Sequence, residues 1–345
     1  MKLDQLAPAD IVAAAPAIFR FNLDNDPALL IVFTDGTVVL PSLRYRVNTD
    51  PQLMTKGILA ATHGKHIKNA YIILLAPIGP DLPLAVNLSL SALSALTMAQ
   101  IHTRAQLRVE RIERNAQWTD LRTGQAGTLP DPATTAAAMA GLLRPVVNLP
   151  NLHDIRALFT PAAPVTVSDA DADAARPDFP AETLGELVQL IRAYAIYDPQ
   201  LRQELIADLN ESRTATAPLA ARLAYLLRDN ESAPDAIIGL GLIDVGAAAT
   251  VYTELANQLT GTDRAYLLTA VAIFHYSDRR GAHAHEALRY ADIAVTDART
   301  DRPPLLKMMM SAYESAIEPT QATKLLLSGK QVAYRFGFDV QTLCW

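Results

Sequence analysis

The sequence predicts an α+β protein, in which an N-terminal mixed sheet with covering helices precedes an all-helical C-terminal domain with a tetratricopeptide-like hairpin. Short apolar runs alternate with helical patterns in the first 160 residues, and only helical patterns follow residue 182. Half of the 345 residues are hydrophobic and 19% are charged, which is enough apolar material for a sizeable core. We expect an α+β domain (1–160), an acidic Pro/Ala linker (161–182), a helical domain (183–319) and an apolar C-terminal tail (320–345).

The N-terminal domain begins with an alanine-rich segment from Ile11 to Phe19, which predicts a helix lying flat on the sheet, with a bend or a break at Pro16. Apolar runs at 29–33 and 38–40 flank Asp35-Gly36, an arrangement typical of a β-hairpin. The patterns that follow predict a helix at 51–62, a buried strand at 71–75, a helix at 82–103, a strand at 106–112 with a bulge near Ile112, and an extended stretch from Trp118.

The C-terminal domain contains one convincing helical hairpin. An apolar helix at 265–276 precedes a turn near Gly281, and the second helix carries alanines three and four residues apart before Pro303. Small residues at this spacing let two antiparallel helices approach closely, as in a tetratricopeptide repeat. A solitary hairpin within an ordinary helical bundle is the other interpretation. The helical patterns cover 183–210, 215–228, 233–259, 263–277, 281–298 and 303–317.

Charge and cysteine content exclude several classes of protein. The net charge of −6 and the pI near 5.6 give no electrostatic reason to bind nucleic acid. A single cysteine, Cys344, excludes a disulfide framework and a cysteine-ligated metal centre. The N-terminal residues lack the basic start and long apolar run of a signal peptide, and no stretch has the length of a membrane helix. We therefore expect a cytoplasmic protein with no membrane contact.

Several short motifs occur in a particular order along the chain. They are Pro8-x-Asp10-Ile11-Val12-Ala13-Ala14-x-Pro16, Phe21, Leu30-Ile31-Val32, Arg46, Trp118, Gly127-Thr128-Leu129-Pro130-Asp131-Pro132, and the alanine-rich helix from Gly281 to Ala294. In this order they resemble the actinobacterial family known as domain of unknown function 4192, over most of residues 5–318. The resemblance implies a fold and a lineage, but it brings no catalytic residues. The departures are Arg20 in place of a glycine, the absence of Asp-Leu-Pro after Arg46, and an added tail beyond Pro319.

The seven histidines do not predict a metal site. His63 and His66 are three residues apart, but the glycine between them indicates the end of a helix. The hairpin turn brings His275 towards the start of the second helix, yet His283 and His285 lie about 200° apart around a helix and cannot both face one ion. We therefore expect no resident metal ion.

Two other motifs do not meet the requirements of the sites that they resemble. Asp169-x-Asp171-x-Asp173 has neither the glycine nor the glutamate that complete a calcium-binding loop. Gly239-x-Gly241…Gly246 has its third glycine two residues late and follows too short a run for the strand of a dinucleotide site. The sequence therefore predicts no cofactor and no catalytic residue.

The arginine pairs are the best-placed polar groups. Arg44 and Arg46 share one face at strand spacing, and with His63 they form a candidate site for an anionic, nucleotide-like small molecule. Cross-strand ion pairs with acidic neighbours are the other interpretation of the two arginines. The candidate interaction residues are Arg279 and Arg280 in the hairpin turn, with Phe336, Phe338 and Trp345 in a tail that we expect to dock on something.

The leading hypothesis is therefore a non-enzymatic regulatory or protein-interaction protein that binds a protein partner or associates with itself. An enzyme or ligand-binding protein that uses the N-terminal sheet is the first alternative. The second alternative is a phage accessory or assembly factor, because the alanine-rich composition, with arginine favoured over lysine, suits an actinobacterial genome of high GC content or one of its phages.

Overall fold

The computed structural model describes residues 7–19, 23, 27–36, 39–40, 42–134, 152–162, 179–196, 198–211, 219–315 and 317–343. The chain divides into two compact units. The first, which we name the sheet unit, comprises Met1–Asp154 and Glu314–Ile317. The second, the helical unit, comprises Ile155–Tyr313 and Glu318–Trp345. The predicted α+β class is confirmed, since a mixed sheet with helices precedes a largely helical region.

The sheet unit is built on a six-stranded sheet with the order β2-β1-β3-β4-β5-β6. The pair β3–β4 is parallel and every other neighbouring pair is antiparallel. A parallel pair needs a crossover connection, and α3 provides it between β3 and β4. The strands are β1 (Ala28–Thr34), β2 (Leu43–Arg46), β3 (Asn69–Leu75), β4 (His102–Val109), β5 (Gln117–Asp120) and β6 (Ala126–Thr128).

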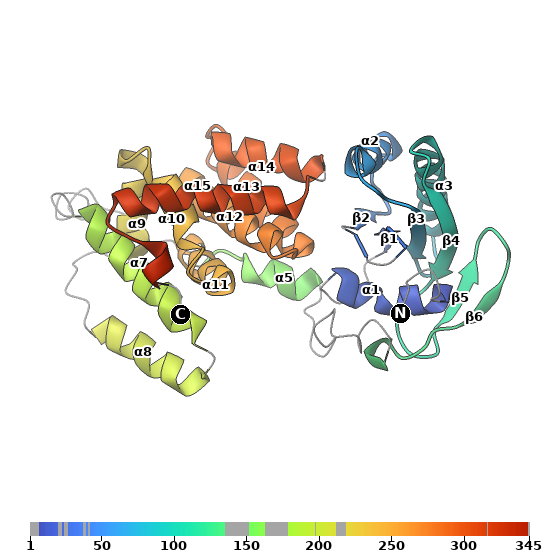
Figure 1. Ribbon diagram of the computed structural model, residues 1–345, viewed down its shortest axis with the longest axis horizontal. Helices are drawn as coiled ribbons and strands as arrows, with labels where there is room; N and C mark the ends of the chain where they lie inside the picture. Colours follow the sequence, from blue (N-terminus) through green and yellow to red (C-terminus); the bar gives the residue numbers. More distant parts are fainter. Residues whose placement is uncertain are drawn as a thin grey trace. The chain divides into compact units, whose positions relative to one another are not determined.

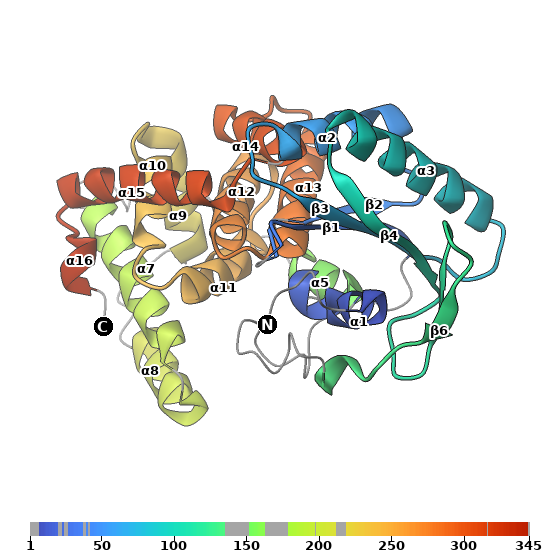
Figure 2. The same cartoon turned by 45° about the vertical axis from the view of Figure 1, so that its right-hand side comes forward.

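Helices cover both faces of this sheet. Figure 1 and Figure 2 show α2 (Pro51–Thr62) and α3 (Leu82–Met98) on one face and α1 (Pro8–Phe19) on the other. Since both faces are covered, every residue of β1 and β3 is buried, and both strands read as continuous apolar runs. The core beneath α2 and α3 includes Leu29, Ile31, Phe33, Met54, Ile58, Ile72 and Leu88.

Three predicted elements of the sheet unit differ from the structure. Helix α1 continues through the buried Pro16, so of the predicted bend or break the break is absent. The strand that pairs with β1 lies at 43–46 instead of 38–40, and the described part of 38–40 joins β1 through the bridge between Thr34 and Val39. Strand β4 ends at Val109, and the irregularity in its pairing lies opposite Ala70 and Tyr71, far from Ile112. Gln106 of this strand is buried and donates to the Ser89 hydroxyl on α3 (3.0 Å).

The helical unit is organised around α12 (Gly261–Ser277), which is buried over most of its length. It packs against α9, α10, α11, α13 and α15. The predicted hairpin is present as α12 and α13 (Gly281–Asp297), and the alanines at 284, 287, 291 and 294 are buried. The remaining helices are α5 (Leu152–Leu158), α7 (Phe179–Ala195), α8 (Pro199–Glu211), α9 (Leu219–Asp229), α10 (Ala233–Leu240), α11 (Val245–Ala256), α14 (Pro304–Glu314), α15 (Pro319–Arg335) and α16 (Val340–Leu343).

Two predicted long helices are each divided in the structure. The segment predicted at 183–210 forms α7 and α8, and Asp198 accepts hydrogen bonds from the first backbone N–H groups of α8. The segment predicted at 233–259 forms α10 and α11, and the Asp244 side chain caps α11 by accepting from the Ala247 N–H. Aspartate at a cap satisfies N–H groups that a helix terminus leaves unpaired, so both breaks have a local cause.

The C-terminal tail docks within the helical unit as α15 and α16. Figure 1 shows α15 lying across α10 and α12. The two helices α10 and α15 meet at Gly239 and Gly329, where a Cβ atom on Gly329 would lie 2.4 Å from the Asp235 carbonyl oxygen. Only glycine allows two backbones to approach this closely. The glycine at 239 that resembles a dinucleotide motif is therefore a helix-packing residue.

Candidate functional site

The solvent-facing side of α3 carries large apolar side chains without any charge. Leu84, Leu90 and Met98 are 55%, 50% and 68% exposed. The helix contains no Asp, Glu, Lys or Arg in its 17 residues. Its opposite side, with Ala85, Leu88, Ala92 and Leu96 among others, packs on the sheet. We name the exposed side the α3 face.

The hydroxyl groups on the α3 face are satisfied by their own helix. Ser91 donates to the Asn87 carbonyl (3.1 Å), Ser94 to the Leu90 carbonyl (3.1 Å) and Thr97 to the Leu93 carbonyl (2.9 Å). A hydroxyl that already donates a hydrogen bond loses less when water is removed from it. These hydroxyls can therefore be covered by an apolar surface at a small desolvation penalty.

The apolar character continues into neighbouring segments. Ile78, in the loop that precedes α3, is 75% exposed, and Leu53 on the adjacent helix α2 is more than half exposed. From residue 76 to residue 101 the sequence has a single charged side chain, Asp81. Single exposed apolar residues are normal on protein surfaces, but an uncharged group of them marks a surface for interaction.

The structure places the three predicted ligand-binding residues on two elements, with Arg44 and Arg46 on β2 and His63 at the end of α2. Leu43 and Tyr45 of β2 pack on the side of α2 and α3, so Arg44 and Arg46 alternate to the side that carries α1. His63 is the exposed C-cap of α2, about 18 Å along that helix from its start beside β2. The residues of β1 directly opposite the two arginines are the apolar Leu30 and Ala28.

The predicted interaction residues take part in contacts inside the helical unit. Arg280 pairs with Asp278 (2.7 Å) and donates its backbone N–H to the His275 carbonyl (2.7 Å), which closes the turn between α12 and α13. Arg279 adopts a left-handed conformation (φ 60°) in the same turn. In the tail, Phe336 is half-buried, and the half-buried ring of Phe338 lies near Gly185 of α7. Trp345 lies outside the described residues.

Two buried histidines meet at the base of this turn. The rings of His275 and His283 have centroids 4.9 Å apart, and the Nδ1 atom of His283 has no hydrogen-bond partner among the described residues. Burial, together with the nearby Arg280 charge, lowers the pKa of His283 to about 4. Burial, His283 and Arg280 lower the pKa of His275 well below its usual value. Both rings are therefore neutral at pH 7.

The third histidine of this hairpin contacts a different ring. His285 stacks on Tyr313 instead of joining the pair (5.4 Å between ring centroids). Among the residues that the structure describes, no group of three or more His, Cys, Asp or Glu side chains could hold a metal ion. The Arg280 charge that lowers both pKa values would also repel a cation.

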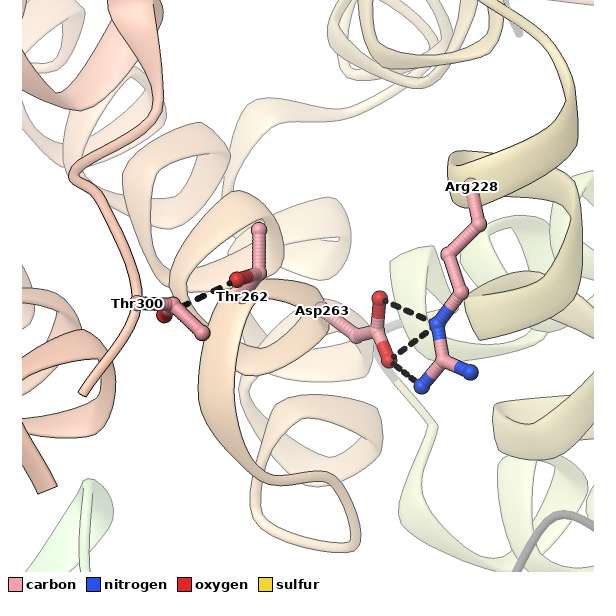
Figure 3. A network of polar contacts seen from close by, with 4 residues as sticks. All are labelled: Arg228, Thr262, Asp263 and Thr300. Carbon is pink, nitrogen blue, oxygen red and sulfur yellow. Dashed lines mark hydrogen bonds and ion pairs between the residues drawn. The ribbon is translucent and has the colours of Figure 1, made fainter. Parts of the chain in front are cut away.

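Charged residues inside the helical unit hold its helices together. Figure 3 shows Arg228, at the end of α9, reaching the buried Asp263 in the first turn of α12. Thr262 points away from this pair and donates to Thr300, which follows α13 (3.1 Å). These contacts fix the start of α12 to two other segments.

Within the described part of the chain, no helix combines the length and apolarity that a membrane span requires.

The α3 face is the candidate site that the sequence patterns did not reveal. Leu84, Leu88, Leu96 and Met98 recur in the sequence at roughly helical spacing, although Leu84 and Met98 lie on the outside of the helix and Leu88 and Leu96 on the inside. The signal that distinguishes the two sides is the absence of charge. A helix buried on one side only should carry charged residues on the other, and α3 does not.

A mixed six-stranded sheet covered by helices, followed by a largely helical region, defines the molecule as an α+β protein. The sequence model of the family described as a domain of unknown function (DUF4192) matches residues 8–319, and the chain therefore belongs to this family. The resemblance noted in the sequence is thus confirmed, and the match ends where α15 begins. No curated protein and no solved structure matches the chain.

Proposed function

We propose that the chain is a non-enzymatic regulatory or protein-interaction protein and that the α3 face is its docking surface. The observation that supports this proposal is the exposure of Leu84, Leu90 and Met98 on a helix without charge. Burial of apolar surface contributes about 25 cal/mol per Å². The uncharged residues around these side chains add no charge to be desolvated, and their hydroxyls are already satisfied.

The tail supports this proposal less than its composition suggested. Its apolar residues Ala322, Leu326 and Ala333 are buried within the helical unit, where they pack instead of remaining available to a partner. The exposed residues of α15 include Leu327 and Tyr334, but Lys324 and Arg335 interrupt them. We therefore centre the proposed docking function on α3.

Native mass spectrometry of the full chain, purified gently from its native host, tests the proposal. We expect an added mass the size of a protein, lost in the variant Leu90→Asp. The matched control is Leu327→Asp, because Leu327 is exposed to the same degree (52%) on α15 and should leave the added mass in place.

Two outcomes would overturn the proposal. One is a chain that stays alone at 37.3 kDa in the wild type at every concentration. The other is an added mass of small-molecule size that disappears on denaturation, which would favour a ligand-binding function. Denaturing spectra of each variant confirm the chain mass, and circular dichroism confirms that both aspartate variants are folded.

A further inference from the structure

We infer that the partner of the α3 face is a second copy of this chain, packed so that the two α3 helices run antiparallel across a two-fold axis. This inference rests on the docking function proposed above and names its partner. It rests on the pattern of side chains along the face, on the absence of charge from that face and on the charged residues that flank α3.

The α3 face has the spacing of a helix–helix seam. Leu84, Asn87, Ser91, Ser94 and Met98 follow one another at intervals of three, four, three and four residues. This interval keeps side chains on one stripe that faces a neighbouring helix. The large side chains Leu84 and Met98 stand at the two ends, and the polar Asn87, Ser91 and Ser94 stand between them. Leu90 flanks this stripe, because it lies three residues after Asn87 and four before Ser94. In an antiparallel pair centred on Ser91, Leu84 of one copy lies beside Met98 of the other.

The absence of charge suits a symmetric partner in particular. A two-fold interface places the same patch on both sides, so a charged side chain near the axis meets a like charge. Like charges that face each other are destabilising, and the stripe contains none. A partner of different sequence would instead permit opposite charges on the two surfaces, and α3 offers no charge for such a partner to match.

The charges at the ends of α3 favour the antiparallel direction. Asp81 precedes the first residue of α3, and the exposed Arg104 lies in β4, shortly after the last. In an antiparallel pair, Asp81 of one copy lies near the C-terminal end of α3 in the other copy. Arg104 follows that end of the helix by a few residues. The dipoles of the two helices also oppose each other in this direction, which is favourable.

The size of the surface sets the expected strength. Seventeen residues make α3 about 26 Å long. A single helix pair buries less than the ~800 Å² per partner of a standard interface, even when Ile78 and Leu53 contribute. Both edge strands are short, with four residues in β2 and three in β6, so pairing through the sheet edge would add few hydrogen bonds. We therefore expect a dimer that dissociates at low concentration.

Sedimentation velocity of the full chain over a range of concentrations tests the inference. We expect a monomer–dimer equilibrium whose dissociation constant rises at least tenfold in Leu90→Asp and in Met98→Asp. The same change at Leu327 should leave it unaltered. In a chain carrying Cys344→Ser, the substitution Ser91→Cys should give disulfide-linked dimers under mild oxidation, because Ser91 lies near the axis. The substitution Ser328→Cys, at an exposed position on α15, should not.

The results distinguish the inference from the proposed function. A chain that is monomeric at the highest concentration, or a dimer that Leu327→Asp abolishes and Leu90→Asp does not, overturns the pairing through α3. If that monomer still carries a different protein in native mass spectra, and Leu90→Asp removes it, the docking function stands and only the second copy is excluded. If no protein is bound at all, both fail.

Discussion

Acidification should destabilise the helical unit through His283. In the unfolded chain this histidine has the ordinary pKa near 6.5, and in the folded protein its pKa is about 4 because it is buried beside Arg280. The folded state therefore takes up its proton at lower pH than the unfolded state does. The stability that neutral His283 allows is complete above pH 6.5 and is lost as the pH falls towards 4.

The size of this effect follows from the two pKa values. Between about pH 7.5 and about pH 5, the unfolded chain binds most of one proton at this site and the folded chain binds almost none. The difference in binding lowers the free energy of unfolding by about 2 kcal/mol. The pKa of His275 is lowered as well, so this residue adds to the loss in the same direction.

Urea unfolding of the full chain, followed by circular dichroism at several pH values, measures this loss. The comparison is with His283→Leu, a variant that cannot titrate at this position and that removes the buried, unpartnered Nδ1 atom. The decline in stability from pH 7.5 to pH 5 should be smaller by about 2 kcal/mol in the variant. Equal declines in the two proteins would refute the reasoning. A matched control is His102→Leu, because His102 is exposed in the sheet unit.

Two further substitutions test the packing of the helical unit. Gly329→Ala should lower the free energy of unfolding by at least about 2 kcal/mol, because the added Cβ meets backbone atoms of α10. The control Ser328→Ala, on the exposed side of α15, should change it by less than about 0.5 kcal/mol. Equal urea midpoints for the two variants would contradict the close crossing. Arg228→Gln should lower the free energy of unfolding by about 1 kcal/mol, because Asp263 stays buried while Arg228 is 62% exposed, and a midpoint unchanged from wild type would show that the pair contributes nothing.

Local signals were enough to place much of the sheet unit. Helix α2 occupies the predicted residues, because Asp50 caps its first turn and Pro51 suits the first helical position. Strand β3 was identified from its apolar run, since both faces are buried. Strand β2 was not identified from the sequence. The run at 38–40 is more apolar and closer to the turn, whereas Arg44 and Arg46 alternate with apolar residues in β2, as is usual in an edge strand.

The candidate site was harder to predict for a physical reason. The buried side of α3 is lined partly by Ala85, Ser89 and Ala92, which are small because the helix lies close to the sheet. The exposed side carries larger apolar residues, so hydrophobicity alone points to the wrong side. Which side is inside depends on contacts with β4, such as that between Gln106 and Ser89, and these contacts are distant in sequence. In contrast, the glycines at 239 and 329 are explained only by their meeting in the fold.

The crossing of α10 and α15 has a practical meaning for anyone who divides this chain. The family match stops at residue 319, yet α15 begins there and packs directly against the backbone of α10 at Gly239. A fragment trimmed to the family limits would expose the apolar surface that Ala322, Leu326 and Ala333 now cover. The residues that match the family therefore end before the last helices that pack in the helical unit. Expression and crystallisation of this protein should keep the chain whole at its C-terminal end.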